Sequence, residues 1–306
     1  MRNLLMTLAL WWALSAWATD VFPTKPVRWL APVLAGGAGD LIARAIAPRL
    51  SEMWGQPVII DNRPGSGGTL GMGIAARMPT DGYTMVLGVS SFVVMAPGVY
   101  PKLAYDPVKD FAPVTQILSA PLMLVVHPSL PAKNIKELIA LARVNPDAIS
   151  YASPGNGSAA HLATEMFRSM SGTRMLHVPY RGAPPVYTDL MAGRISVYMG
   201  TIPAALPLTK SGRLKVLATT GPVRARVLAE VPPVSESGLK GYEVTTWYGA
   251  LMPAGTPALL VGRIHADMTR VVRLPDMRER FASEGGDVVA TTPASSICQA
   301  VDEAAA

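Results

Sequence analysis

The chain has 306 residues, of which 16% are charged, and its formal net charge is +6. This length allows two lobes of ordinary domain size. The lysines and arginines are scattered and form no basic stripe interleaved with aromatic residues, so a nucleic-acid partner is not indicated. Cys298 is the single cysteine, and therefore no disulfide can form within the chain.

The first 18 residues have the features of a secretory signal peptide. Arg2 supplies a positive start, residues 4–14 are mostly apolar, and Ala16-Trp17-Ala18 is typical of a cleavage site. The apolar run is shorter than the about 20 residues that a membrane span needs. We therefore expect cleavage after residue 18 and export to the periplasm.

The first predicted unit runs from a strand over 27–31 through a glycine-rich loop into a helix over 40–53, which Gly55 ends. The free N–H groups at a helix start, together with the helix dipole, favour an anion. We expect Asp40 to serve this helix start as a capping group. The backbone N–H groups of residues 37–40 then remain available for ligand oxygens.

Strands and helices alternate along the rest of the chain, which predicts an α/β fold with mainly parallel sheets flanked by helices. The first half is expected to continue with strand 58–61, helix 69–77, strand 84–90, a helical or irregular stretch to about Tyr100, and strand 122–126. The second half is expected to contain helix 134–144, strand 149–152, helix 158–170, strand 175–178, helix 183–193, strand 195–199, helix 203–211, strand 214–219, a long connection over 222–241, and helices near 257–273 and 275–284.

Two segments are expected to cross between two α/β lobes. The apolar run 122–126 leaves the first lobe, and residues 242–248 lead back to it. Two such crossings make a hinge. We therefore predict residues 19–121 and 247–306 as lobe I and residues 122–246 as lobe II, with a ligand cleft between the lobes.

A second glycine-rich loop, residues 153–158, follows the predicted strand 149–152 and opens the next helix. Ser158 is a good N-cap, and this helix start is also suited to phosphate or carboxylate. Our working hypothesis is that both loops face one cleft and hold a small carboxylate. Residues 155–160 also fit the G-x-G-x-x-A dinucleotide pattern, but no Asp or Glu ends the next strand to bind a ribose hydroxyl, so this alternative is weaker.

Catalytic and metal-binding patterns are weak in this sequence. Ser90 follows a predicted strand, but Phe92 stands where a nucleophile elbow needs its last glycine. His161 lies one turn into its helix. A lone histidine at such a place more often supports a loop by hydrogen bonding than acts as a base, so we expect the supporting role for His161. No cluster of His, Cys, Asp and Glu has the spacing of metal ligands. We therefore predict a protein that is not an enzyme and has no metal or cofactor.

Several segments resemble the periplasmic receptors of tripartite tricarboxylate transporters, also called the Bug family. The resemblance runs from about Phe22 to Pro293. The segments that carry it are Pro26-Val27-Arg28 with Gly36-Gly37 and Asp40, Gly55-Gln56-Pro57-Val58, Asp61-Asn62-Arg63-Pro64-Gly65-Ser66-Gly67-Gly68, Asp81-Gly82-Tyr83-Thr84, Gly155-Asn156-Gly157-Ser158 with His161-Leu162-Ala163, Val178-Pro179-Tyr180-Arg181-Gly182, and Trp247-Tyr248-Gly249 with Pro253-Ala254-Gly255-Thr256-Pro257.

This resemblance implies a two-lobed type II periplasmic binding protein that closes on a small carboxylate: a di- or tricarboxylic acid, an acidic amino acid or an aromatic acid. It also implies delivery of that ligand to a membrane permease. The implied ligand contacts are Gly37, Ala38, Gly39, Asp40, Ser90, Ser91, Ser153, Gly155, Asn156, Gly157 and Ser158, with Arg181 and Gly182 adjoining them and His161 near the loop.

The far end of the ligand is expected to meet Met199, Thr201 and Phe92. The segment 198–201 carries no carboxylate where the family usually has Phe-Asp, which argues against an amino-acid ligand. Three alternatives stay open. They are a receptor that presents its closed form to a signalling partner, a small-acid or ester hydrolase that uses His161 and a serine, and a relative that has lost ligand binding.

Overall fold

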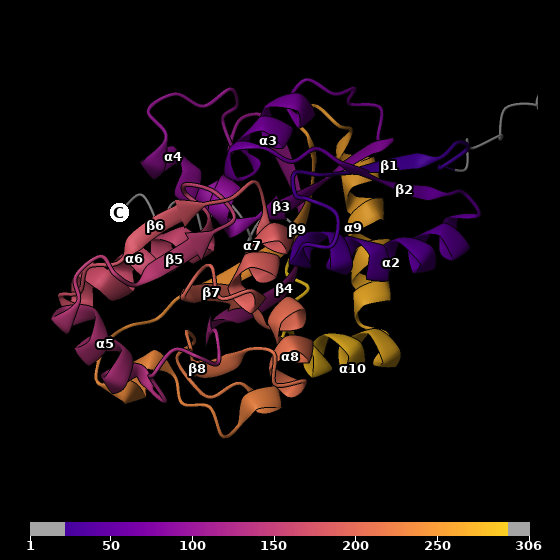
Figure 1. The fold of residues 1–306 in the computed structure, drawn as a ribbon. Coiled ribbons are helices and arrows are strands. Elements are labelled where there is room, and N and C mark those ends of the chain that lie inside the picture. The colour runs from indigo at the N-terminus through magenta and orange to yellow at the C-terminus, as the bar shows by residue number, and fades with distance from the viewer. Residues whose placement is uncertain (1–21, 293–306) are drawn as a thin grey trace, which may run out of the picture.

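The computed structural model describes residues 22–292, and its first part contains a three-stranded parallel sheet with β1 in the centre. Helices α2 and α3 connect these strands (Figure 1). The elements of this part are β1 (Val27–Ala31), α2 (Ala38–Trp54), β2 (Val58–Asn62), a 3-10 turn (Ser66–Gly68), α3 (Thr69–Ala75), β3 (Thr84–Val89), a π-helical turn (Ser91–Met95) and α4 (Ala96–Val99).

The second part repeats this design, because β5 pairs in parallel with both β6 and β7. The parallel pairing follows from the helices that connect the strands, since parallel neighbours need a crossover. The elements of this part are α5 (Ile135–Val144), β5 (Ser150–Ser153), α6 (Ala159–Ser171), β6 (Leu176–Pro179), α7 (Ala183–Met191), β7 (Val197–Thr201), α8 (Ile202–Lys210), β8 (Lys215–Thr219) and two 3-10 turns (Arg226–Leu228 and Val234–Ser237).

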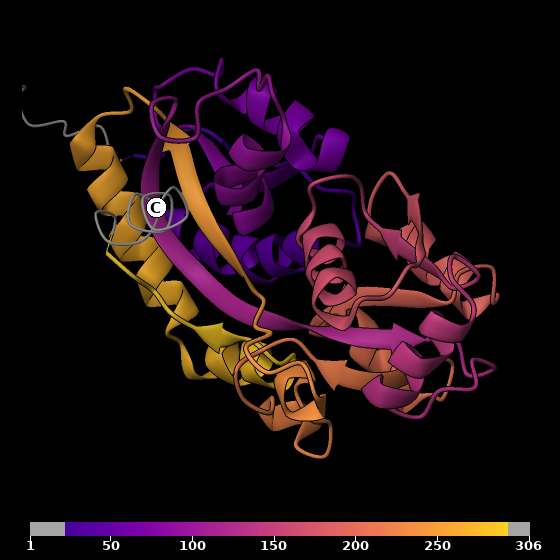
Figure 2. The same ribbon diagram turned by 90° about the vertical axis from the view of Figure 1, so that its left-hand side faces the viewer.

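Two long strands, β4 (Phe111–Val126) and β9 (Thr245–Pro253), join the two parts. They pair with each other antiparallel and run side by side in Figure 2. The sheet order is β2-β1-β3-β9-β4-β7-β5-β6, with β8 and β10 pairing β4 outside this path. The chain ends its described part with α9 (Ala258–Val272), α10 (Pro275–Ser283) and β10 (Asp287–Val288).

Buried apolar side chains form two separate clusters. The first includes Trp29 and Phe281, which come from opposite ends of the described chain. The second includes Tyr151 and Phe167 and is drawn from one continuous part of the chain. Each cluster lies under one of the two parallel sheets, so each half has its own core. The residue boundaries of lobe I and lobe II remain a prediction.

The structure differs most from the sequence-based expectation along β4. We expected a strand only over 122–126, but β4 begins at Phe111. The segment contains prolines, which are unusual inside a strand because proline cannot donate to a ladder. Pro113 stands where the pairing with β9 shifts register, and such a bulge tolerates it. Because β4 and β9 pair antiparallel, the complete sheet is mixed, whereas its outer strands are parallel as expected.

Within residues 22–292, no helix combines the length and the apolar character that crossing a membrane requires. The predicted signal peptide and Cys298 lie outside the described residues.

Candidate functional site

A cavity of about 450 Å³ lies between the two halves of the molecule. Loops that follow β1, β5 and β6 and the end of β7 line it, so it lies beyond the carboxyl ends of the parallel strands. Ligands of open α/β sheets bind in such crevices, because the loops there can carry functional groups without disturbing the sheet. The hypothesis of one cleft between two glycine-rich loops thus matches the arrangement of the chain.

Helix α2 begins at this cleft. Gly37 is its N-cap residue, and Gly37, Ala38 and Gly39 line the cavity. The structure gives the N–H groups of Ala38 and Gly39 no hydrogen-bond partner among the described residues, as is normal for the first turn of a helix. Both N–H groups are therefore free to bind a ligand oxygen.

Helix α6 begins at the same cleft from the other half of the molecule. Its N-cap residue Ser158 accepts a hydrogen bond from the N–H of His161 through Oγ (3.3 Å) and donates one to the Gly155 carbonyl (2.7 Å). The N–H groups of Ala159 and Ala160, which also line the cavity, have no partner within the part of the chain that the structure describes. The two loops therefore offer free N–H groups to one space.

The charge around the cleft is positive. Helices α7 and α8 also begin at the lining, at Gly182 and Thr201, so four helix dipoles have their positive ends there. Arg181 is the one charged side chain among the described residues of the lining, and it has no ion-pair partner within residues 22–292. No carboxylate of the described chain lines the cleft. This electrostatic setting favours an anion.

Asp40 stabilises the α2 loop instead of facing the ligand space. Its carboxylate is 2% exposed and accepts hydrogen bonds from Gly36 N (2.9 Å), Arg44 Nε (2.9 Å) and Asn62 Nδ2 (2.9 Å). Burial by itself raises the pKa of Asp40, but the hydrogen bonds from Arg44, Gly36 and Asn62 outweigh it, so the pKa is lowered and the carboxylate stays charged. As expected, Asp40 lies in the first turn of α2, where a negative charge suits the helix dipole. It also fixes the turn before the N-cap through the Gly36 N–H.

The structure brings most of the predicted site residues to the cavity lining. They are Gly37, Ala38, Gly39, Ser91, Gly155, Asn156, Ser158, Arg181, Gly182, Met199 and Thr201, together with Phe92. Five predicted residues are not part of the lining: Asp40, Ser90, Ser153, Gly157 and His161. Ser90 Oγ shares a hydrogen bond with Thr246 Oγ1 (3.0 Å). Asp40 makes the three hydrogen bonds given above. Ser153, Gly157 and His161 belong to a hydrogen-bonded group behind the second loop. Direct ligand contacts of these five residues stay predictions, and the hydrogen bonds that the residues make within the protein do not favour such contacts.

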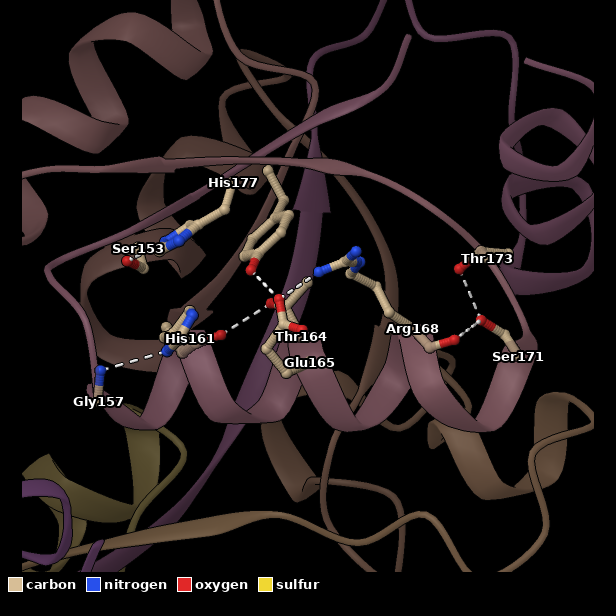
Figure 3. Close-up of polar contacts among 11 residues, drawn as sticks. Ser153, Gly157, His161, Thr164, Glu165, Arg168, Ser171, Thr173 and His177 are labelled. Carbon is tan, nitrogen blue, oxygen red and sulfur yellow. Dashed lines mark hydrogen bonds and ion pairs between the residues drawn. The ribbon is translucent and has the colours of Figure 1, made fainter. Parts of the chain in front are cut away.

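His161 and His177 form a stack behind the second loop (Figure 3). Their ring centroids are 4.3 Å apart, and the ring of Tyr151 stacks on His177 at 4.7 Å. His161 Nδ1 accepts a hydrogen bond from the Gly157 N–H (3.2 Å), and His177 Nε2 pairs with Ser153 Oγ (2.7 Å). The stack thus holds both ends of the glycine-rich loop, and the Gly157 N–H is not free for a ligand.

This stack has an electrostatic consequence. Burial lowers the pKa of both histidines, and for His177 the nearby His161 adds to the effect, so its pKa falls to about 4. Glu165 lies next to this stack and accepts hydrogen bonds from Tyr151 and Arg168. Both imidazoles are therefore neutral at pH 7. A neutral His161 is required, because its Nδ1 acts as an acceptor.

The Ser153–His177 pair does not form a hydrolase site. A serine nucleophile must reach its substrate, but Ser153 is fully buried and does not line the cavity. The His161 ring bonds the loop backbone at Gly157, and the structure gives it no serine partner among the described residues. Within the described part of the chain, no group of His, Cys, Asp and Glu is suited to hold a metal ion.

The two halves touch each other at the mouth of the cleft. Tyr100 Oη donates a hydrogen bond to the Asn156 carbonyl (2.7 Å), which lies in the opposite loop. The Gly67 backbone approaches the same carbonyl so closely that a Cβ at residue 67 would lie 2.7 Å from the oxygen. Gly67 also has φ +63°, so a glycine is required here on two grounds.

The sequence analysis missed the wall where the sheet passes the cleft. We call the lining residues of β3, β4, β7 and β9 the sheet wall: Val89, Leu122, Tyr198, Met199, Thr201, Thr246 and Tyr248. Only Met199 and Thr201 were predicted. Leu122 lies opposite Thr201 and Val89 lies opposite Tyr248 in the pairing registers, which sequence spacing does not reveal. Tyr248 was part of a recognised segment, but its direction was not known.

The family model "Tripartite tricarboxylate transporter family receptor" matches residues 42–305. A UPF0065 protein in the tcbD-tcbE intergenic region of Pseudomonas sp. (strain P51) is 38% identical over 267 residues, which are 87% of this chain and 79% of the relative. R. palustris Rpa4515, solved with adipate, is 34% identical with a TM-score of 0.90. The match covers 92% of this chain and 94% of the Rpa4515 chain. The periplasmic binding protein BugD is 31% identical with a TM-score of 0.88, and the match covers 93% of this chain and 96% of the BugD chain.

Replacing Gly67 with alanine should hold the cleft open. The new Cβ meets the Asn156 carbonyl across the mouth, so the contact between the halves is lost. Small-angle X-ray scattering should give Gly67→Ala a larger radius of gyration than the parent protein. Gly55→Ala is the matched control, since Gly55 has φ +65° and nothing within 4 Å of its Cβ position. The left-handed backbone costs an alanine about 1–2 kcal/mol in both variants. Equal radii for the two variants would contradict the role of Gly67.

Stability should depend on pH through the histidine stack. An unfolded histidine binds its proton near pH 6.5, whereas folded His177 binds one only near pH 4. The unfolded state therefore binds more protons between these values, and the free energy of unfolding should decrease as the pH falls from about 6.5 to about 4. Urea unfolding across this range should show a shallower decrease for His177→Gln. An unchanged slope would show that His177 does not contribute.

Proposed function

The chain belongs to the family of tripartite tricarboxylate transporter receptors, and we propose that it captures a small carboxylate between its two lobes and delivers it to a membrane permease. The observation that carries the proposal is the convergence of free N–H groups from α2 and α6 on one cavity without any lining carboxylate. Hydrogen bonds to a charged acceptor are the stronger kind, and several together support micromolar or tighter binding.

The adipate in the structure of R. palustris Rpa4515 supports a carboxylate as the ligand class. The contact between the halves at Tyr100 and Asn156 supports a cleft that closes on its ligand and excludes water. Export with removal of residues 1–18 fits this role, because a receptor of this kind meets its ligand outside the inner membrane. We also propose that the ligand is released unchanged, since Ser153, the buried serine that bonds a histidine ring in the described chain, does not line the cleft.

A panel of acids tests the ligand class. In a thermal-shift screen of residues 19–306, di- and tricarboxylates, aromatic acids and acidic amino acids should be compared with neutral amides of the same size. A ligand at a hundred times its dissociation constant adds about 2.7 kcal/mol to folding stability, which is a shift of several degrees. At least one acid should raise the melting temperature while its amide does not. A well-folded protein that responds to no acid would overturn the proposal.

Proline substitutions can remove the proposed donors one at a time. Ala159 is the first residue of α6 and Ala38 is the first residue of α2, and proline is well tolerated at this position of a helix. Ala159→Pro and Ala38→Pro should fold normally but lose one N–H group each. A hydrogen bond to a charged group contributes about 1.5–3 kcal/mol, so the affinity for the acid should fall about tenfold to a hundredfold.

Ala258→Pro is the matched control for these variants. Ala258 is the first residue of α9, is exposed and does not line the cavity. Calorimetry should show that it binds the acid as the parent protein does. If Ala159→Pro and Ala38→Pro keep the parental affinity while folding like the control, the carboxylate is not held by the two helix starts.

A further inference from the structure

One peptide group, that between Asn156 and Gly157, is held by both halves of the molecule. Its carbonyl oxygen accepts the hydrogen bond from Tyr100 Oη (2.7 Å), and its N–H group donates to His161 Nδ1 (3.2 Å), as Figure 3 shows for the second contact. The peptide is trans, so its C=O and N–H groups point to opposite sides of one rigid plane. Tyr100, which directly follows α4, and His161 on α6 therefore hold this plane from its two edges. We call the peptide and its two partners the latch.

The latch lies where the two halves meet at the mouth of the cleft. Tyr100 and Asn156 both line the cavity. A Cβ at Gly157 would lie 3.0 Å from a ring carbon of Tyr100 and 3.2 Å from a methyl carbon of Val99. The close approach of Gly67 is to the same Asn156 carbonyl. These contacts centre on one peptide, so its orientation decides whether the halves can meet there.

The latch requires a neutral His161, because Nδ1 accepts a hydrogen bond only while it carries no proton. The titratable groups around this ring in its own half are Glu165 and Arg168 on α6, His177 on β6 and Tyr151 on β5. Burial has the largest effect and lowers the pKa of His161, Arg168 lowers it further, and Glu165 opposes both. The ring is therefore neutral at pH 7 and takes up its proton on acidification.

Tyr100 is the titratable group that meets the peptide from the other half. Burial raises its pKa, so its hydroxyl keeps its proton and remains a donor. The hydroxyl also lies 3.3 Å from the Ser66 carbonyl, but its single hydrogen favours the shorter contact with the Asn156 carbonyl. His177 binds a proton only near pH 4. At weakly acidic pH, the proton of His161 is therefore the one that changes the latch.

Protonation reverses the role of His161 Nδ1. This atom then carries a hydrogen and faces the Gly157 N–H, which is also a donor. The imidazole is confined, because it stacks on His177 with ring centroids 4.3 Å apart. The peptide can turn instead, since Gly157 has φ +72° and glycine adopts either sign of φ. A half-turn brings the Asn156 carbonyl to the new Nδ1–H and takes it away from Tyr100, so each protonation state has its own hydrogen bond.

We propose that the latch makes closure of the cleft sensitive to protons: neutral His161 keeps the Asn156 carbonyl on Tyr100 and the halves together, whereas protonated His161 releases them. The consequence for the ligand rests on the proposed function, because it assumes that the closed cleft holds a carboxylate. Closure excludes water and strengthens the hydrogen bonds inside, so acidification weakens capture of the acid. Tyr100 and His161 are positioning residues, which act through the peptide between them.

The coupling can be measured without any ligand. If the Tyr100 hydrogen bond favours neutral His161, its loss must favour the protonated form by the same factor. The chain has four histidines, so NMR can follow the ring C–H signal of each one against pH, and the signal missing from His161→Asn is that of His161. In Tyr100→Phe the proton affinity of His161 should rise about two- to tenfold, as the loss of one neutral hydrogen bond allows.

Two controls belong to this titration. Tyr83→Phe removes a hydroxyl outside the cavity lining and should leave the His161 titration unchanged. His127 and His265 lie outside the stack and should titrate alike in the parent protein and both tyrosine variants. A His161 titration that is the same in Tyr100→Phe as in the parent protein would overturn the proposal.

Small-angle scattering measures the opening itself. The radius of gyration of the parent protein should increase as the pH falls through the His161 titration, whereas that of Tyr100→Phe should already be large at pH 7 and change little. His161→Asn should stay compact at both pH values, since its side-chain oxygen can accept from the Gly157 N–H but binds no proton. Circular dichroism would check that each protein stays folded. A parent protein that stays compact with His161 protonated, or His161→Asn that opens on acidification, would contradict the latch.

The outcomes separate this inference from the proposed function, because neither the titration nor the scattering needs an acid. If both behave as expected but no acid raises the melting temperature, the latch stands and the proposed function fails. If an acid binds but the His161 titration and the radius of gyration do not respond, the latch fails and the carboxylate-binding function stands.

Discussion

The site depends on one constraint of helix geometry: the first N–H groups of an α-helix have no partner within the helix. In a parallel sheet, the helices that follow neighbouring strands all begin at the same edge. Here α2 and α6 come from two sheets whose carboxyl edges face each other across the cleft. The free N–H groups of both helices therefore reach one cavity, and an anion receives hydrogen bonds without any side chain that must first be ordered.

Such a site works only if its loops are rigid, and the charged and polar side chains near the cleft serve this purpose. The Asp40 carboxylate accepts hydrogen bonds from Gly36, Arg44 and Asn62, so it fixes the first loop and does not repel an anion. His161 and the Ser153–His177 pair fix the second loop from behind. In both loops the conspicuous polar residues thus act through the backbone, and the backbone is the part that contacts the cleft.

This division explains which parts of the site the sequence could predict. Glycine-rich loops between a strand and a helix are local features, so lining residues 37–39, 155, 156 and 158 could be predicted from the strand-loop-helix pattern. The function of Asp40 and His161 was only partly predicted, because their partners are fixed by folding. The sheet wall was largely missed, since it arises from the registers of β3, β4, β7 and β9, and only residues 122–126 of β4 were expected to form a strand.

The same division separates affinity from specificity. Backbone N–H groups recognise a carboxylate but not the molecule that carries it, so the two helix starts would bind many acids alike. Discrimination must then come from the surface along which the rest of the ligand lies. In this chain that surface is a β-sheet, and a substitution in its side chains leaves unchanged the loops that we propose to hold the carboxylate. Gly67 lets the two halves meet beside Asn156, so a ligand body that does not fit this surface would oppose closure of the proposed cleft.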